Sequence, residues 1–438
     1  MFSLPSPCSA LIAATYFLTV SATTVSSNTT AACTAISGSS IETLTLSNDF
    51  LNSEYINAKD HYWSAANADL SPACAVFPTS AGEVSSIVST LLKYPDVKFA
   101  TKSGGHNSNV GWSSVDGGVL IVMSNLGPNT TFNSADSTAN IPPGARWDTV
   151  IGALEPYSVA VVSGRLGDVG VAGLTLGGGL SFLSGQYGLV CDNVVNYEVV
   201  LANASIVNAN ASCNSDLFFA LKGGGNQFGI ITSFTMKTYP IGTNGQVWGG
   251  VRTYSGTYAE QIINATQNFT ENYFQHPKAA VIVTSEIAID SLLDIFVVFF
   301  FYDGETPPAG IFDAFDALPT VTDAAKTQTY SDLLNADDTT NIYGLRYLIR
   351  GTTIPNLPAP TGKTLFLNHY NSWKSYVLSN NALHPSFIFS LAFQPMPAII
   401  PAHSAAAGGN ALGMDARNGD FMWMEYDISW LTELGDDE

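Results

Sequence analysis

Three glycine-rich clusters contain the residues whose types and spacing could do chemistry. They span residues 102–107, 164–179 and 221–232. Glycine lets the backbone approach a ligand because no Cβ stands in the way, and successive backbone N–H groups in such turns form concavities that bind anions. The clusters therefore favour a site that holds a diphosphate through backbone N–H groups rather than through lysine. For any one cluster alone, tight turns and close strand packing explain the glycines equally well.

Other common chemistries have no support in the sequence. It contains no G-x-G-x-x-G, P-loop, H-E-x-x-H or G-x-S-x-G motif. The six histidines, at positions 61, 106, 276, 369, 384 and 403, lack metal-ligand spacing, and no C-x-x-C occurs. We therefore expect no metal centre.

The charge balance excludes polyanionic partners. The 438 residues include 16 Lys and Arg and 36 Asp and Glu, which gives a formal net charge of −20. Nucleic acids and anionic membrane surfaces need a basic footprint, so we expect neither as a partner. Apolar residues make up 46% of the chain, and this length and composition suffice for two domains with large cores.

The N-terminus predicts export. Residues 1–22 carry no charged side chain, include an apolar stretch and end in Val-Ser-Ala, as a secretory signal peptide does. A short buried helix is the alternative. Six N-x-Ser/Thr sequons occur, at Asn28, Asn129, Asn203, Asn210, Asn264 and Asn268. No segment reaches the roughly 20 apolar residues of a spanning helix, so we expect a secreted, extracellular glycoprotein.

Four cysteines follow the signal segment, at positions 33, 74, 191 and 213. An even number in an oxidising compartment permits two disulfides with three connectivities. Our preferred pairing is Cys33–Cys74 with Cys191–Cys213.

The elements that must position the clusters follow from periodicity and turn residues. Residues 23–40 are rich in Ser and Thr, which predicts a flexible segment, and Ser80 begins a predicted helix over residues 80–94. After residues 240–242 glycine becomes rarer, and eight acidic residues between positions 303 and 338 favour a solvated helix face. Strands are predicted over residues 97–101, 119–123, 198–202, 205–207, 230–236, 279–289 and 292–302, with a short helix over 216–221.

In order and spacing, the three clusters resemble those of the secreted FAD-linked oxidases with a PCMH-type flavin domain, which include berberine bridge enzyme and fungal oligosaccharide oxidases. The resemblance implies a two-domain α+β fold of the vanillyl-alcohol-oxidase type. After the signal peptide (1–22) and an N-terminal segment (23–66), residues 67–243 would bind FAD and residues 244–438 would form a substrate domain with an antiparallel sheet. It also implies that Cys74 pairs with Cys33. The family's C-terminal tail is expected to be lacking after Glu438.

The resemblance assigns FAD-binding residues. His106 matches the histidine that bonds covalently to the flavin in this family, and a neutral imidazole is a nucleophile near pH 7. Members with a second link have a cysteine where this chain has Leu166, so attachment through His106 alone is implied. The other implied FAD contacts are Ser103, Gly104, Gly105 and Asn107 around the pyrophosphate, Asp168, Val169, Gly173, Leu174, Gly178 and Gly179 along the adenosine diphosphate and ring, and Asp192 and Ile231 near the ribityl chain and adenine.

The resemblance further implies an FAD-dependent oxidase that takes hydride from a small molecule and is reoxidised by O2. Period-2 geometry places Trp423, Glu425 and Asp427 on one face of a strand. Trp423 aligns with the family's catalytic base, so Glu425 is the nearest carboxylate, with Tyr302 and Tyr426 as alternatives. We expect a monomer that acts on a secondary metabolite. The alternative function is a non-oxidising flavin protein or an inactive secreted glycoprotein of the same fold.

Overall fold

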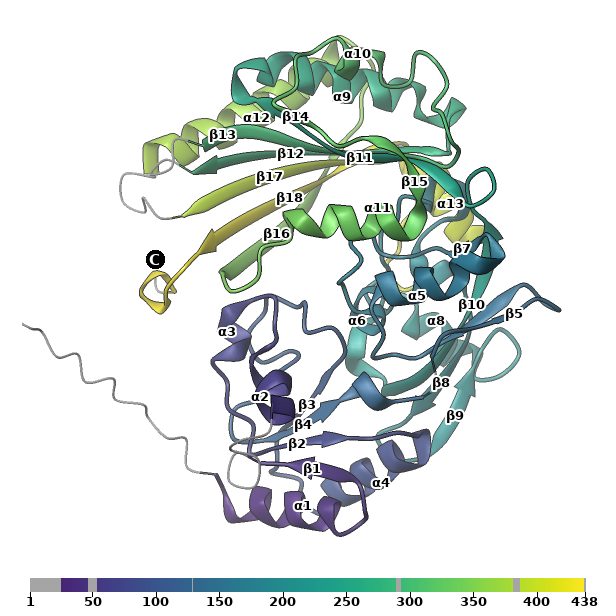
Figure 1. The fold of residues 1–438 in the computed structure, drawn as a ribbon, viewed down its shortest axis with the longest axis vertical. Helices are drawn as coiled ribbons and strands as arrows, with labels where there is room; N and C mark the ends of the chain where they lie inside the picture. The colour runs from purple at the N-terminus through teal and green to yellow at the C-terminus, as the bar shows by residue number, and fades with distance from the viewer. Residues whose placement is uncertain (1–24, 46–52, 128, 289–292, 381–386, 437–438) are drawn as a thin grey trace, which may run out of the picture.

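The computed structural model describes residues 25–45, 53–127, 129–288, 293–380 and 387–436. The predicted signal peptide lies outside the described residues. Within them the chain forms three β-sheets, of four, six and eight strands. The first two sheets fill the lower part of Figure 1, and the third sheet and its helices fill the upper part.

The first sheet has the strand order β1-β2-β4-β3, in which β2, β4 and β3 are parallel. The predicted helix over residues 80–94 is confirmed as α4. Ser80 caps this helix because its side chain accepts the N–H of Glu83 at 3.3 Å. The elements of this part are α1 (Ser27–Ser37), β1 (Glu42–Leu44), α2 (Ser53–Asp60), α3 (Ala65–Ala68), β2 (Cys74–Phe77), α4 (Ala81–Leu91), β3 (Phe99–Lys102) and β4 (Val119–Val122).

The N-terminal segment differs from the prediction. Residues 27–37 form α1 instead of a flexible segment, because Ser26 caps the helix and Ala32 and Ile36 pack into the core beneath the first sheet. The disulfide between Cys33 of α1 and Cys74 of β2 is confirmed.

The predicted pairing of Cys191 with Cys213 is wrong. Both thiols are free, and the reason is their placement. Cys191 is buried in the turn that precedes β8, whereas Cys213 lies in an exposed turn that follows β9.

The second sheet has the order β5-β6-β10-β8-β9, with β7 paired to β10. Its core includes the fully buried Trp147 at the start of α5. The elements are β5 (Thr131–Asn133), β6 (Thr138–Ile141), α5 (Trp147–Leu154), β7 (Val159–Val161), α6 (Val171–Leu176), α7 (Ser184–Tyr187), β8 (Val194–Val200), β9 (Ile206–Ala209), α8 (Ser215–Leu221) and β10 (Ile230–Pro240). The predicted boundary at residues 243 and 244 falls in the turn between β10 and β11.

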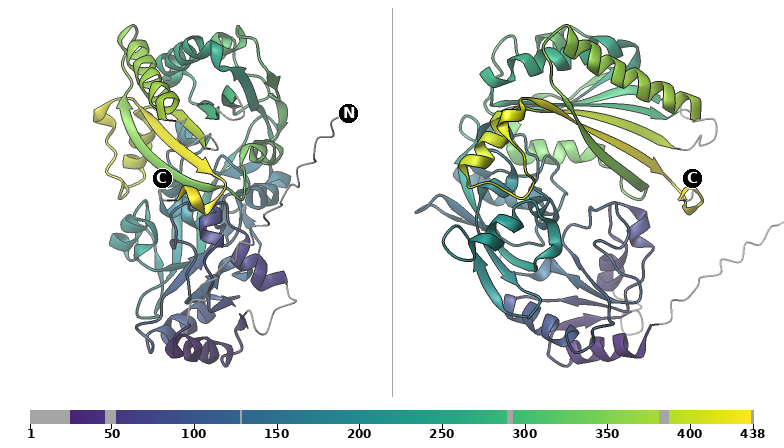
Figure 2. Two further views of the ribbon diagram at one scale, coloured as in Figure 1. Left: turned by 90° about the vertical axis from the view of Figure 1, so that its left-hand side faces the viewer. Right: turned by 180° about the vertical axis from the view of Figure 1, so that it is seen from behind.

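The third sheet is antiparallel and has the order β14-β11-β13-β12-β17-β18-β16, with β15 paired to β11. Helices α9, α10 and α12 cover one face, and the other face looks toward the glycine clusters (Figures 1 and 2). Its elements are β11 (Gln246–Ser255), α9 (Ala259–Asn272), β12 (Ala279–Ala288), β13 (Leu293–Tyr302), α10 (Asp313–Asp316), β14 (Thr322–Asp323), β15 (Lys326–Thr329), α11 (Tyr330–Asp337), β16 (Arg346–Pro355), α12 (Thr361–Asn380), β17 (Ile388–Met396), α13 (Ile399–Ala406) and β18 (Phe421–Trp430).

The acidic run between positions 303 and 338 is not one solvated helix face, contrary to the prediction. Asp303 is 3% exposed and accepts the N–H of Gly242 at 2.5 Å. Asp316 and Asp323 both pair with Arg252 of β11. The chain breaks into short elements here because these carboxylates bind specific partners on neighbouring strands.

Candidate functional site

His106 lies in the loop after β3 and is enclosed by residues from distant segments. Trp63 stacks on the imidazole with ring centroids 4.7 Å apart, and Tyr343 meets it edge-on at 6.0 Å. The Nε2 atom of His106 lies 2.9 Å from the side-chain nitrogen of Asn341 and 3.8 Å from Oδ1 of Asp168. The predicted site residues His106 and Asp168 are therefore brought together.

The imidazole of His106 is held neutral. Its pKa is lowered to about 4, chiefly by burial and also by the nearby Arg146, while Asp168 opposes the shift. A neutral ring keeps a lone pair on one nitrogen, which is what a nucleophile needs.

The His106 loop presents four successive backbone N–H groups that have no acceptor. Nothing in the described part of the chain accepts a hydrogen bond from the N–H of Gly104, Gly105, His106 or Asn107. Gly104 and Gly105 are buried, and buried N–H groups are almost always paired. Gly105 has a φ of +70°, a left-handed conformation that helps to build an anion-binding concavity. The loop therefore has the donors that an anion such as a diphosphate requires.

The first and second clusters touch through glycines. A Cβ on Gly104 would lie 2.5 Å from the backbone nitrogen of Gly170, so close packing does require glycine here. Arg146, at the start of α5, donates to the carbonyl of Gly104 at 2.9 Å and to the carbonyl of Asp168. Lys102 packs beside Gly105, but its ammonium group donates to a carbonyl of α2 at 2.6 Å. The positive charge beside the unpaired N–H groups is therefore that of Arg146.

The inner face of the third sheet, defined here as its face toward the glycine clusters, continues the site. In the strand register, Asp427 of β18 lies beside Ser390 and Ile349, and Glu425 and Trp423 occupy the next two positions on the same face. The three side chains predicted to share a face do share it.

This inner face reaches His106 through stacked aromatic rings. Tyr347 of β16 lies on the same face and stacks on Trp63 with centroids 3.7 Å apart. Trp63 in turn stacks on His106. The sheet face and the His106 loop are therefore in contact through Trp63.

Arg165 of the second cluster reaches across to the inner face. Its guanidinium donates to the side-chain oxygen of Gln394, and its charge faces Glu425 and Asp427. The indole N–H of Trp423 donates to Oε2 of Glu425 at 3.3 Å. Glu425 therefore has one neutral donor and one cation nearby.

Asp427 has an unusual charge state for a carboxyl group. Its pKa is raised to about 8, chiefly by burial and also by Glu425 and Glu286, while Arg165 opposes the shift. Two adjacent carboxyl groups on one strand face therefore differ in environment, with only Glu425 lining the cavity beside them.

A cavity of about 610 Å³ lies between the second cluster and the inner face. Gly177, Gly179 and Leu189 line one side, and Trp423 and Glu425 of β18 line the other. The lining is mainly apolar with a few polar groups, which is typical of small-molecule sites.

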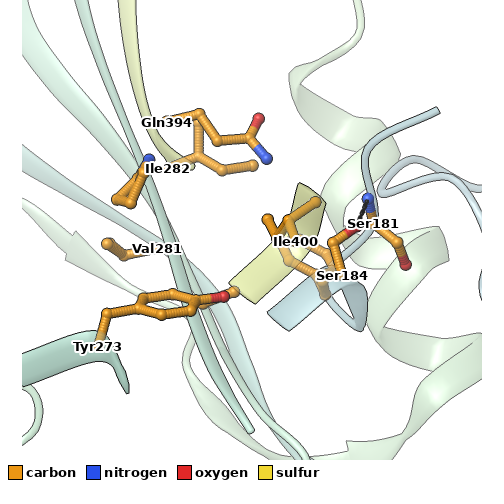
Figure 3. A pocket seen from close by; sticks show the side chains of 10 residues that line it. Ser181, Ser184, Tyr273, Val281, Ile282, Gln394 and Ile400 are labelled. Carbon is orange, nitrogen blue, oxygen red and sulfur yellow. Dashed lines mark hydrogen bonds between the residues drawn. The ribbon is translucent and has the colours of Figure 1, made fainter. Parts of the chain in front are cut away.

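A second cavity is far smaller, at about 10 Å³. It is enclosed by Tyr273, Ser184 and Gln394, among others, and the N–H of Ser181 donates to Ser184 at its edge (Figure 3). Its volume suits one water molecule and no substrate.

Several residues that were predicted to contact FAD contact other residues of the protein in this structure. The carboxylate of Asp192 accepts the N–H of Leu189 at 3.0 Å and the side chains of Ser404 at 2.5 Å and Asn410 at 3.0 Å. Asp192 therefore joins the second sheet region to the loop after α13. Its predicted contact with the ribityl chain or adenine stays a prediction.

The other predicted FAD-binding residues lie in different surroundings: some are in the protein core, one glycine packs against another loop, and one glycine has no atoms close to it. Ile231 is 3% exposed in the core of the second sheet. A Cβ on Gly178 would lie 2.7 Å from Leu412, whereas no atom lies within 4 Å of a Cβ on Gly173. Val169 and Leu174 pack partly buried against the same core as Ile231.

Neither of the two alternative tyrosines lies on the inner face with Glu425. Tyr426 pairs with His369 of α12, and Tyr302 packs against the helix-covered core of the third sheet. Both lie on the face opposite Glu425, because side chains alternate between the faces of a strand.

Sequence reasoning missed Arg146, Asn341, Trp63 and Arg165. Three of them contact the loops from positions remote in sequence, so no local motif indicates Trp63, Arg146 or Asn341. The one available signal for Arg165 was its place inside the second cluster, beside Gly164. No group of three or more His, Cys, Asp or Glu side chains that could hold a metal ion occurs among the described residues.

Asp337, at the end of α11, supplies a testable pH effect. It is fully buried, and both carboxylate oxygens lack a hydrogen-bond partner among the described residues. Burial raises its pKa well above the ordinary value, and Asp338 adds to the shift. We expect Asp337→Asn to stabilise the fold by about 1–3 kcal/mol at pH 7.5, since an unpaired buried acid is costly.

The sign follows from proton linkage. The pKa of Asp337 is higher in the folded state than in the unfolded state. The destabilisation that Asp337 causes therefore grows as the pH rises above the unfolded-state pKa, and it vanishes below that pKa. The gain should therefore shrink toward zero near pH 4 in urea unfolding curves. The exposed Asp332→Asn on the same helix, which removes the same charge, should change stability by no more than about 0.5 kcal/mol. An equal gain at both pH values would contradict this account.

Comparison with known proteins agrees with this geometry. A family model described as an FAD binding domain matches residues 72–210. An uncharacterized FAD-linked oxidoreductase of Arthroderma benhamiae is 39% identical over 385 residues, which are 88% of this chain and 75% of the relative. An FAD-dependent monooxygenase of Aspergillus calidoustus is 32% identical over 88% of this chain and 72% of its own length.

Solved structures share the fold at lower identity. Glucooligosaccharide oxidase of Acremonium strictum superposes with a TM-score of 0.73 at 19% identity, over 95% of this chain and 85% of that one. Xylooligosaccharide oxidase of Myceliophthora thermophila gives a TM-score of 0.71 at 20% identity, over 93% and 84%. No helix among the described residues is long and apolar enough to cross a membrane. With its glycine loops, its flavin-domain match and these relatives, the chain belongs to the FAD-linked oxidoreductases with a PCMH-type flavin domain.

Proposed function

We propose that this protein is an FAD-dependent oxidase of a small, mainly apolar molecule, with FAD bonded to His106 alone and O2 as the electron acceptor. The observation that carries the proposal is the row of unpaired N–H groups at residues 104–107, directly beside a neutral, partly accessible imidazole. Secondary metabolism is the proposed context, and a monomer the proposed state.

The residues present fit the cofactor. The unpaired N–H groups and Arg146 offer donors and positive charge to a diphosphate, while His106 offers a nucleophile. A glucooligosaccharide oxidase that shares the fold is described as carrying a 6-S-cysteinyl, 8α-N1-histidyl FAD. Leu166 has no nucleophilic group, which supports a single link here. Bound FAD would accept the substrate's hydride.

The protein's own groups supply binding and proton transfer. The apolar walls of the 610 Å³ cavity exclude water and hold the substrate. Glu425, which lines that cavity, is the proposed acceptor for the proton of a substrate hydroxyl or amine. Arg165 and the indole N–H of Trp423 stabilise its carboxylate, which orients it toward the cavity.

We also propose that the protein is exported and glycosylated. The Cys33–Cys74 disulfide supports this, since disulfides persist in oxidising compartments. The sequon residues Asn28, Asn129, Asn203 and Asn268 are exposed.

The test starts from the culture medium of a fungal expression host. The protein recovered there should begin after residue 22 and should shift in mobility when treated with an N-glycosidase. After denaturation and precipitation, flavin absorbance should stay with the polypeptide. A colourless protein, with no flavin released into the supernatant, would refute the oxidase proposal.

A second readout separates the reaction types. The curated relatives named FAD-dependent monooxygenases suggest oxygen insertion as the competitor. With ¹⁸O2 and a turnover substrate, an oxidase yields labelled hydrogen peroxide and an unlabelled product. Label in the organic product would overturn the oxidase assignment and leave the flavin site standing.

A further inference from the structure

The side chain of Asn341 stands between His106 and Asp168. Its Nδ2 atom lies 2.9 Å from Nε2 of His106, and 2.7 and 2.9 Å from the two carboxylate oxygens of Asp168. One nitrogen therefore contacts both groups at hydrogen-bond distance.

These contacts fix where the protons are. An ionised carboxylate only accepts hydrogen bonds, so one hydrogen of the Asn341 amide points at Asp168. The other hydrogen points at Nε2 of His106, which must then be unprotonated, with the ring proton on Nδ1. Turning the amide over would set its oxygen against the carboxylate, which is repulsive.

The same contacts oppose protonation of the ring. A proton on Nε2 would face the N–H of Asn341, donor against donor, and would be held away from Asp168 at 3.8 Å. Burial and Arg146 oppose the added charge, whereas Asp168 and a hydrogen bond to the backbone of His106 favour it. The titratable groups around this ring, taken over all packed segments, are His61, Arg146, Asp168, Asp338, Tyr343 and Tyr347.

Asn341 is itself held in place by the Asp168 loop. Its backbone N–H donates to the carbonyl of Asp338 at 2.9 Å, and the carboxylate of Asp338 accepts the N–H of Asp168 at 3.2 Å. The segment after α11 is therefore hydrogen-bonded to the second glycine cluster at two points, through Asp338 and through Asn341.

We infer that Asn341 is a positioning residue that keeps the imidazole of His106 neutral and competent to bond to the flavin. The inference rests on the proposed covalent attachment. That bond joins Nδ1, the ring nitrogen that Asn341 leaves free, to the flavin methyl carbon, with one proton lost from the methyl group and one from Nδ1. The two electrons remain on the flavin and pass to dioxygen, which becomes hydrogen peroxide.

The test measures the fraction of flavin that is covalent after the flavin-free protein is incubated with FAD in air. For the unaltered protein this fraction should be constant between pH 5 and pH 8. Asn341→Asp replaces the donor with an acceptor of the same shape and adds a negative charge. The covalent fraction should then fall as the pH drops, with its midpoint raised by about 1–3 pH units.

Two further variants keep the result interpretable. Asn335→Asp adds the same charge at an exposed position of α11 and should leave the profile flat. Asn341→Ser removes the donor to His106 without adding charge, and its midpoint should also rise, though less. Total flavin, covalent and released, is measured in every sample.

The outcomes separate the two proposals. A flat profile for Asn341→Asp and Asn341→Ser, with normal total flavin, overturns the role of Asn341 and leaves flavin binding intact. Absence of bound flavin in the unaltered protein overturns the proposed function itself. As a flavin-independent check, the imidazole signals of His106, assigned with His106→Ala, should show an upward shift of its titration in Asn341→Asp.

Discussion

Replacement of His106 by alanine should abolish covalent flavin while leaving the fold intact. The unpaired N–H groups of Gly104, Gly105 and Asn107 remain, so FAD should still bind by hydrogen bonds and leave upon denaturation. The measurement is flavin absorbance in the pellet and supernatant after acid precipitation. All of the colour should move from the pellet to the supernatant.

A histidine elsewhere provides the matched control. His276 lies near the end of α9, outside the glycine loops, and His276→Ala should keep all of its flavin in the pellet. Colour that stays with the polypeptide in His106→Ala would place the link on another residue. Loss of colour in both fractions would instead show that the imidazole is needed for binding itself.

Replacement of Asp192 by alanine should cause the largest loss of stability among simple substitutions at this site. The carboxylate is 4% exposed and accepts hydrogen bonds from Leu189, Ser404 and Asn410. Removing it leaves the N–H of Leu189 and the side-chain amide of Asn410 without this acceptor, while the hydroxyl of Ser404 keeps the carbonyl of Ile400 at 3.3 Å. Each buried donor left without an acceptor costs about 1–3 kcal/mol, so the two together cost about 2–6 kcal/mol, which urea unfolding followed by tryptophan fluorescence will measure.

The same substitution should loosen the loop after α13. The loop that holds Asn410 also places Leu412 against Gly178 and Gly223, so limited proteolysis should cut there sooner. Asp216→Ala removes an exposed acid from α8 and should change the free energy of unfolding by less than about 1 kcal/mol. Equal losses in the two variants would show that the Asp192 network adds nothing beyond a general charge effect.

The sequence predicts the parts of this molecule that depend on local patterns. The capped helix at Ser80 and the long strands β12 and β13 follow from periodicity, because one face of each must be buried. The loop at residues 104–107 follows from its paired glycines. These features need no knowledge of what lies next to them in space.

The remaining parts depend on contacts between distant residues. Asn341 reaches His106 across 235 residues, and nothing around position 341 distinguishes that asparagine from others. Tyr302, Tyr426 and Glu425 could not be separated by sequence, because the pairing register decides which strand face looks toward the loops. Cys191 and Cys213 form an even set with the other two cysteines, and only their placement shows that they do not pair.

The covering of His106 has a consequence for biosynthesis. Trp63, whose backbone N–H donates to the carbonyl of Gly105, is made before His106. Asn341 and Tyr343 belong to a segment that is made much later. At about 5–20 residues per second, a ribosome needs about 10–50 seconds to travel from His106 to Asn341. During that interval the imidazole lacks its amide partner, so under the proposed covalent link the cofactor should attach only after residue 341 has been made.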